Sequence, residues 1–279
     1  MKNYKRFTSL MGVQWNYTKK LFFLLILCFI GAEGSLLYLN LRRTASNFTL
    51  EGQGFDTRFI NGTTPWYYRF ELLLSMSHWD KIFIIGLFLI LILLTSNAFR
   101  QRSAAVVEYT YTRLPMKSNT LLGVMFLHNL SLFLILIGVQ FAMVFVGYKL
   151  YVSFVIEDVV MKQGLFLAFI RWDFLRRLYP ITDGIRLLFN VVCLVHISFM
   201  SAIQGMRTVF RERTAGLDLF VIVAWILLLS LMSDPSIPWF IYITFAIGLD
   251  GLRMFRKYQG MVRRWSEREF DEWDEFSYK

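Results

Sequence analysis

The stretch Arg100–Phe126, RQRSAAVVEYTYTRLPMKSNTLLGVMF, lies between two long hydrophobic segments and decides how the chain is organised. Its neighbours, Ile82–Phe99 and Leu121–Val146, are each long enough to cross a bilayer, which takes about 20 apolar residues. The stretch itself is too polar to remain in lipid and too short to form a domain. Because residues before proline avoid the helical conformation, a short helix over Ser103–Arg113 should end near Leu114–Pro115. We interpret the stretch as a cytoplasmic elbow between two membrane spans.

The composition is that of a membrane protein. Hydrophobic residues make up 56% of the 279 residues, and the mean hydropathy is +0.48. The apolar residues fall in six blocks, which are 21–41, 82–99, 121–146, 185–204, 217–233 and 239–252. The sequence therefore predicts one all-α, polytopic membrane domain with six transmembrane helices. The elbow occupies residues 100–120 and a cytoplasmic tail occupies residues 253–279.

The distribution of basic residues predicts the orientation of the chain. If the N-terminus is inside, the inner segments 1–20, 100–120, 206–216 and 253–279 hold 19 of the 30 Lys and Arg residues. The outer segments 42–81 and 149–186 hold the other 11. Because basic residues accumulate on the cytoplasmic side, both termini are predicted to be inside. The net charge of +10 then reflects topology and attraction to anionic lipids, and nucleic acid is not an expected partner.

The two ends of the chain carry their own patterns. Within residues 1–20, six side chains lie on one helical face: Phe7, Leu10, Met11, Gln14, Trp15 and Thr18. With lysines around it, this face predicts an interfacial helix on the inner leaflet. A cleaved signal peptide is the alternative, but the apolar block continues to Leu41, which argues against cleavage. The tail turns acidic and aromatic after Arg264, typical of a solvated tail or of docking to a basic partner.

Several polar side chains lie within the predicted spans. Glu33 has the largest free-energy cost among them, because it places a carboxyl inside a span. Such a residue is by default a candidate for a functional role. It lies in the small-residue segment Gly31–Ser35, which favours close helix packing and a partner for the carboxyl. The alternative is a role in substrate passage or gating. Asn97, Gln140 and Asn190 are further candidates for the lining of a pathway.

The second outer segment contains an amphipathic stretch. Apolar residues from Phe166 to Ile170 precede the charged run Arg171–Arg177, and Pro180 follows. This pattern predicts a short helix that dips into the outer leaflet and stops at Pro180. Its charged residues are Arg171, Asp173, Arg176 and Arg177. They either receive a substrate headgroup or peptide at the outer surface, or reach lipid phosphate and fix the helix ends.

Catalytic motifs are absent from the sequence. His78, His128 and His196 are the only histidines and lack ligand spacing, so no metal site is predicted. No zinc-protease motif, serine elbow or phosphate loop occurs, so the chain is not expected to be an enzyme or to hydrolyse a nucleotide alone. We expect His128, Asn129 and His196 to bridge helices by hydrogen bonds instead.

The chain resembles ABC-2 type transporter permease subunits. The resemblance rests on the interfacial helix, the six spans, the inner termini and the elbow Tyr111-Thr112-Arg113-Leu114-Pro115-Met116-Lys117. The resemblance implies that the elbow forms a coupling helix that docks on a separate ATPase, which holds ATP and magnesium, so this chain carries no cofactor. It also implies a second permease subunit, either the same chain or a paralogue. The coupling residues it suggests are Arg100, Arg102, Glu108, Arg113, Leu114, Pro115 and Lys117.

The resemblance implies export of a lipid, peptide, glycan or drug-like molecule across the cytoplasmic membrane of a bacterium. The family's re-entrant outer helices usually fall between spans five and six. Here the turn at residues 234–238 is tight, and the amphipathic outer segment follows span three. A non-transporting scaffold or sensor and a secondary transporter are the alternative functions. Association with an ATPase separates the exporter from both.

Overall fold

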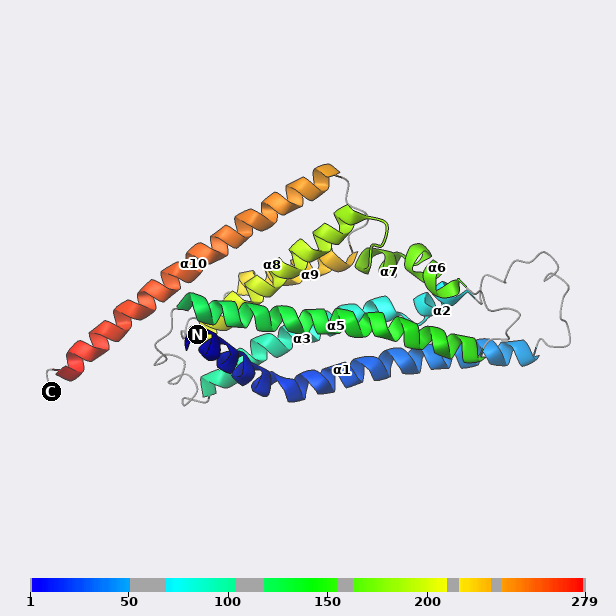
Figure 1. The fold of residues 1–279 in the computed structure, drawn as a ribbon, viewed down its shortest axis with the longest axis horizontal. Helices are drawn as coiled ribbons and strands as arrows, with labels where there is room; N and C mark the ends of the chain where they lie inside the picture. Colours follow the sequence, from blue (N-terminus) through cyan, green and yellow to red (C-terminus); the bar gives the residue numbers. More distant parts are fainter. Residues whose placement is uncertain are drawn as a thin grey trace. The chain divides into compact units, whose positions relative to one another are not determined.

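The structure, a computed structural model, describes residues 2–50, 69–103, 118–154, 163–209, 216–231 and 237–277. All regular secondary structure in these ranges is helical. The helices, shown in Figure 1, are α1 (Lys2–Leu50), α2 (Phe70–Met76), α3 (Trp79–Ser103), α5 (Ser118–Phe154), α6 (Gly164–Arg171), α7 (Asp173–Leu178), α8 (Gly184–Val209), α9 (Gly216–Leu231) and α10 (Ile237–Ser277).

Three of the described helices are long and apolar enough to cross a membrane. Their spanning parts are Phe7–Arg43, Asn119–Phe154 and Gly184–Arg207. A fourth candidate is the pair Phe70–Met76 and Trp79–Leu94. Taken together, the two helices are also long and apolar enough to cross a membrane, but they are bent by 53° relative to each other. The chain is therefore an all-helical, multi-pass membrane protein. Helix α9 overlaps the predicted span 217–233 as far as Leu231, and α10 contains the predicted span 239–252. Neither is among the helices that are long and apolar enough to cross a membrane, so the count of six spans stays a prediction.

Two expected boundaries do not occur as breaks between helices. The segment 1–20 and the span 21–41 form one continuous helix, α1, because Lys19, Lys20 and Leu21 favour helix and no proline or glycine interrupts them. In the same way, α10 runs from the predicted last span through the predicted tail to Ser277. The face of residues 1–20 on which the interfacial helix was predicted includes Leu10, Gln14 and Thr18, and these three side chains are buried within the protein.

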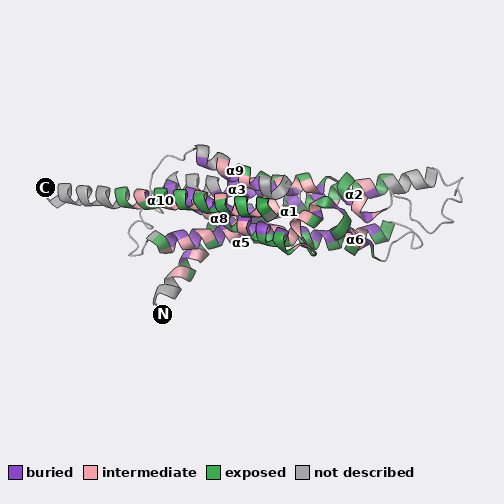
Figure 2. Ribbon diagram, turned by 90° about the horizontal axis from the view of Figure 1, so that it is seen from above, coloured by how far each residue is buried: buried purple, intermediate pink, exposed green. Residues whose placement is uncertain are grey.

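The chain divides into two compact units, each built from segments that are distant in sequence. The first contains residues 1–22, 88–133 and 189–279, and the second contains residues 23–87 and 134–188. Figure 2 shows buried and exposed positions alternating along the long helices. Many of the exposed side chains are large and apolar, such as Leu27, Ile92 and Phe245, as expected where helices face lipid.

The core of the second unit surrounds Trp79, which is fully buried at the start of α3. The cluster contains Leu37, Leu41, Phe70, Leu73, Leu74, Trp79, Met143, Val144, Tyr151, Ala168, Phe169, Trp172 and Leu175. These residues come from α1, α2, α3, α5, α6 and α7, and from Trp172 at the break between α6 and α7. Short helices are marginal alone, so α2, α6 and α7 depend on this burial.

The bend between α2 and α3 is built by three neighbouring residues. Ser77 ends α2, and its hydroxyl donates to the Leu73 carbonyl at 2.7 Å. His78 follows in the left-handed region with φ of 53°, which turns the chain out of the first helix. Asn40 of α1 donates to the Ser77 hydroxyl at 3.0 Å, and the Trp79 indole donates to the Glu33 carbonyl at 3.2 Å. The bend is thus fixed against α1.

Helices α6 and α7 confirm the short amphipathic element predicted in the second outer segment, but as two pieces separated at Trp172. Helix α7 ends at Leu178, two residues before Pro180. The next residue, Tyr179, donates its hydroxyl to the Ile137 carbonyl at 2.6 Å. Ile137 is near the midpoint of the span Asn119–Phe154, so the segment after α7 reaches the middle of α5.

In the first unit, polar side chains join the helices as the sequence predicts. The His128 ring on α5 lies 3.1 Å from the Thr18 hydroxyl on α1, measured from Nε2 to Oγ1. The Asn129 amide lies 2.9 Å from the Ser201 hydroxyl on α8. His196 pairs with Asp250, as described below. The prediction that His128, Asn129 and His196 bridge helices is confirmed.

Candidate functional site

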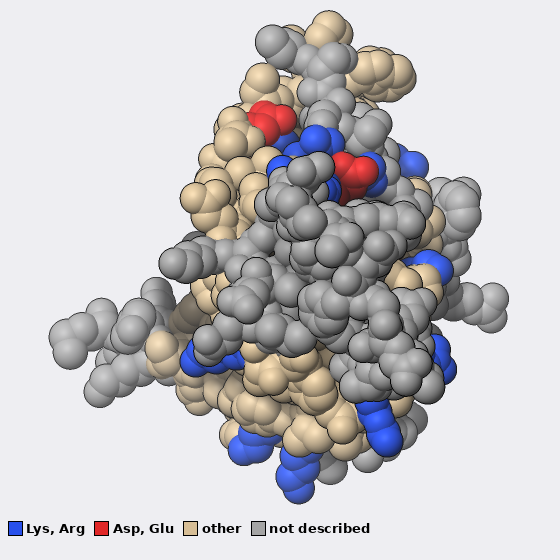
Figure 3. All heavy atoms as spheres, turned by 90° about the vertical axis from the view of Figure 1, so that its right-hand side faces the viewer, with Lys and Arg blue, Asp and Glu red and all other residues tan. Residues whose placement is uncertain are grey.

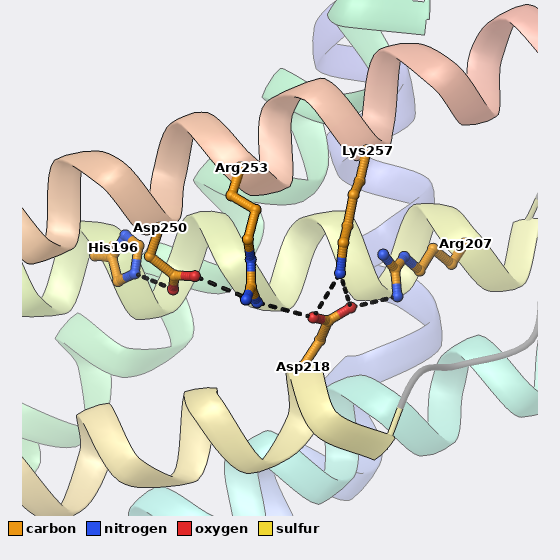
Figure 4. A network of polar contacts seen from close by, with 6 residues as sticks. All are labelled: His196, Arg207, Asp218, Asp250, Arg253 and Lys257. Atoms are coloured by element: carbon orange, nitrogen blue, oxygen red, sulfur yellow. Dashed lines mark hydrogen bonds and ion pairs between the residues drawn. The ribbon is translucent and has the colours of Figure 1, made fainter.

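A network of charged side chains joins α8, α9 and α10 in the first unit (Figure 4). Its centre is Asp218, a fully buried carboxylate in the first turn of α9. Arg207 of α8 donates to Asp218 Oδ2 at 2.6 Å. From α10, Arg253 and Lys257 reach Asp218 Oδ1 at 3.2 and 3.1 Å. One carboxylate therefore holds three cations from two other helices.

The network continues along α10 to a second carboxylate. Arg253 also lies 3.4 Å from Asp250 Oδ1, and Asp250 Oδ2 lies 3.3 Å from His196 Nε2. The rings of His196 and Trp225 on α9 pack in a T-shaped arrangement, with the centroids 5.3 Å apart. The network therefore fixes α8, α9 and α10 to one another at two successive levels.

Burial differs sharply among the members of this network. The side chains of Asp218 and Arg207 are 0% and 8% exposed, whereas those of Arg253 and Lys257 are 44% and 42% exposed. The buried Asp218–Arg207 pair is thus the part that loses most if one partner is removed. The arrangement joins α8, α9 and α10 through one buried carboxylate, which is the geometry of a structural clamp.

A second polar group lies in the second unit, inside the candidate spans. Glu33 of α1 and Gln140 of α5 are both fully buried, and their side chains lie next to each other. Neither side chain makes a hydrogen bond of standard geometry within the described ranges, so both carboxyl oxygens and both amide atoms lack a partner there. The sequence predicts a partner for the Glu33 carboxyl, and Gln140 is the polar side chain that lies beside it. The glycines beside Glu33 do not provide the close packing that was expected, since a Cβ at Gly31 or Gly34 would meet nothing within 4 Å.

Tyr179 borders the same polar group from the segment after α7. Its side chain lies near the Glu33 carboxyl. Its hydroxyl, however, donates to the Ile137 carbonyl at 2.6 Å. It does not supply a hydrogen bond to Glu33.

The other two predicted pathway residues, Asn97 and Asn190, belong to the first unit. Asn97 lies in the last part of α3, where side chains are not described, and Asn190 belongs to the first unit while Glu33 belongs to the second. The coupling residues are also largely outside the described residues. Arg100 and Arg102 lie in the last turns of α3 without a described side chain, and residues 104–117, with Glu108, Arg113, Leu114, Pro115 and Lys117, fall outside the described ranges.

The predicted outer-surface residues pair locally. Arg171 lies 3.6 Å from Glu71 of α2, and Arg176 lies 3.3 Å from Asp173 within α7. The backbone carbonyl of Arg177 accepts a hydrogen bond from Arg186 at 3.4 Å. On the face shown in Figure 3, described Lys and Arg side chains are spread over the surface rather than gathered in one patch. These residues therefore hold α6 and α7 in place as well as offering charge at the surface.

Asp218 was missed by the sequence reasoning, although a signal was present. It is an acidic residue at the start of an apolar block, and such residues mark a paired or functional group by default. Its partners lie 11, 35 and 39 residues away in sequence, and no local pattern links them.

No protein-family model matches this chain. No curated protein and no solved structure is significantly similar to it either.

Proposed function

We propose that this chain is the permease subunit of an ATP-driven exporter of the ABC-2 type. Separate ATPase subunits would hydrolyse ATP, and this chain would move a lipid, peptide, glycan or drug-like molecule across a bacterial cytoplasmic membrane. The proposal draws on the resemblance of residues 100–126 to the elbow of that family and on the multi-pass helical architecture.

The observation that carries the proposal is the position of α6 and α7. These two short helices lie between long candidate spans, and the segment after them reaches the middle of α5 through the Tyr179–Ile137 hydrogen bond. Broken helices at membrane depth are tolerated only where protein or a water-filled cavity surrounds them, and they are characteristic of transporters. A scaffold that only anchors partners has no need of such an element.

The helix before the elbow is suited to transmit motion. Helix α3 continues without a break from Trp79 through Arg100 and Arg102 to Ser103, and residues 104–117 connect it to α5. Displacement of the elbow by a closing ATPase would therefore act on α3 and α5 directly. Glu33 and Gln140, with Asn97 and Asn190, remain the candidates for polar groups along the pathway. A second permease subunit would complete the pathway.

Co-purification tests the proposal most directly. We expect the tagged chain, isolated in mild detergent, to bring along an ATPase identified by mass spectrometry. Replacing Ala104–Arg113 with a flexible Gly/Ser linker of equal length should abolish the association. The double charge reversal Glu108→Lys, Arg113→Glu should uncouple ATP hydrolysis from transport while expression survives.

The matched control places the same linker over Gly52–Asn61 in the first outer segment, and this variant should retain the ATPase. A chain that purifies without any ATPase would refute the proposal. Retention of the ATPase after the elbow is replaced would refute the coupling role of residues 104–113.

A secondary transporter is the second candidate, because the 53° bend between α2 and α3 lies in the same unit as the buried Glu33–Gln140 group. Bent spans near buried polar groups are typical of that class as well. Transport into proteoliposomes by the purified chain alone, driven by an ion gradient, would favour it. Absence of both an ATPase and transport would leave the scaffold or sensor.

A further inference from the structure

Four buried polar atoms meet where α1 and α5 pack together in the second unit. They are the two carboxyl oxygens of Glu33 and the amide oxygen and nitrogen of Gln140, and none has a hydrogen-bond partner within the described ranges. Both residues are 0% exposed. Native proteins leave few such atoms unsatisfied, so each of these requires an explanation.

The surrounding groups do not satisfy the carboxyl. The Trp79 indole from α3 donates to the backbone carbonyl of Glu33 at 3.2 Å rather than to its side chain. The Tyr179 hydroxyl, a titratable group near Glu33, donates its hydrogen bond to the Ile137 carbonyl at 2.6 Å. No cation is paired with Glu33 among the ion pairs of the described residues.

Adding one proton to the Glu33 carboxyl gives these four polar atoms hydrogen-bond partners. An ionised carboxylate has only acceptors, so the Gln140 amide oxygen beside it would find no donor. A protonated carboxyl can donate to that oxygen and accept from the amide nitrogen, which gives all four atoms a partner. An unpaired carboxylate inside a span would also carry the large free-energy cost of an isolated buried charge.

We propose that Glu33 is a proton-binding site within the membrane-spanning helices. A carboxylate oxygen of Glu33 takes a proton from hydronium and leaves water, and the resulting acid pairs with Gln140. Release of the proton requires water to reach Glu33, and therefore requires α1 and α5 to separate near these residues. The inference depends on this packing and not on an ATPase partner, so it holds for either class of transporter.

Carbodiimide labelling of the full-length protein in lipid nanodiscs tests the proposal. Hydrophobic carbodiimides react with protonated carboxyls in apolar surroundings. We expect label on the peptide that contains Glu33 near neutral pH, with the yield falling as pH rises. The label should be absent from Glu71, whose carboxylate lies beside Arg171, and should be lost in Glu33→Gln.

An infrared measurement on the unmodified chain keeps the test independent of whether the variant folds. The spectrum should contain the carbonyl stretch of a protonated carboxylic acid, and Glu33→Gln should remove that band. Absence of both label and band at neutral pH would overturn the proposal. Protection of Glu33 by sodium at constant pH would also overturn it, since the site would then hold a metal cation. A failed ATPase co-purification would leave both readouts unchanged.

Discussion

At the scale of single residues, close packing around the α2–α3 bend depends on Gly147 of α5. A Cβ built there would lie 2.9 Å from the Trp79 ring and 3.0 Å from a methyl group of Leu37. Both of these side chains are fully buried in the core of the second unit. Neither can move away without disturbing the cluster, because protein interiors have little free volume.

We therefore predict that Gly147→Val lowers stability by about 1–3 kcal/mol, the usual cost of an overpacked core. Gly147→Ala should show a smaller loss. The measurement is thermal unfolding of the purified protein, followed by tryptophan fluorescence. Gly138→Ala on the same helix is the matched control, since a Cβ there meets nothing within 4 Å. Equal melting temperatures for the Gly147 and Gly138 variants would contradict the packing argument.

At the scale of helices, the contacts among α8, α9 and α10 concentrate on one acidic residue. Asp218 neutralises the nearly buried Arg207 and also holds Arg253 and Lys257 of α10. If the carboxylate is removed, the two half-exposed cations can turn toward water. Arg207 cannot, so it is left as an uncompensated buried charge.

We predict that Asp218→Asn destabilises the first unit by about 3 kcal/mol, the order found when one partner of a buried ion pair is lost. Cys193 on α8 is fully buried, so its accessibility reports on this unit, whereas Cys28 of the second unit is exposed. Both proteins carry Cys28→Ser and are heated with a fluorogenic maleimide. Labelling of Cys193 should begin at a lower temperature in Asp218→Asn than in the protein that keeps Asp218.

The control for this prediction is Asp173→Asn, which removes an exposed ion pair with Arg176 and should change little. The double variant Arg207→Met, Asp218→Leu should recover part of the loss, because it removes the buried charge together with its partner. If Asp218→Asn protects Cys193 as well as the unmodified residue does, the clamp contributes nothing to stability.

At the scale of the whole molecule, hydropathy predicts the helices well and their ends poorly. The blocks 121–146 and 185–204 appear within α5 and α8, because a long apolar run has few alternatives to a helix in lipid. The division between residues 1–20 and 21–41 was not predicted correctly, since the change from polar to apolar residues does not break a helix. Helix capping and breaking residues, rather than hydropathy, decide such ends.

The candidate sites were also predictable only in part: single residues could be predicted, but most of their partners could not. Glu33 was predictable from its own cost in a span, and the histidines from the partners they require. Gln140 as the neighbour of Glu33, and the partners of Asp218, depend on the rotation of each helix about its axis. That rotation is set by packing among elements distant in sequence, such as the cluster around Trp79. The sequence of one chain does not specify it locally.

The number of spans can be decided at the turn between α9 and α10. Four spans and six spans both place the two termini on the same side, so locating the termini does not separate them. With six spans, residues 232–236 lie outside. The sequence favours this, because residues 232–238 contain no Lys or Arg while residues 253–279 contain seven. The large exposed apolar side chains of α10, from Trp239 to Leu252, also suit contact with lipid.

We predict that Ser236→Cys, in a background without Cys28 and Cys193, reacts with a membrane-impermeant maleimide added to intact cells. Asn61→Cys in the first outer segment should react in the same way, and Ser103→Cys at the elbow should react only after the cells are opened. If Ser236→Cys behaves like Ser103→Cys, α9 and α10 do not cross the bilayer. The charges around Asp218 would then belong to a hairpin on the inner side, and the chain would have four spans.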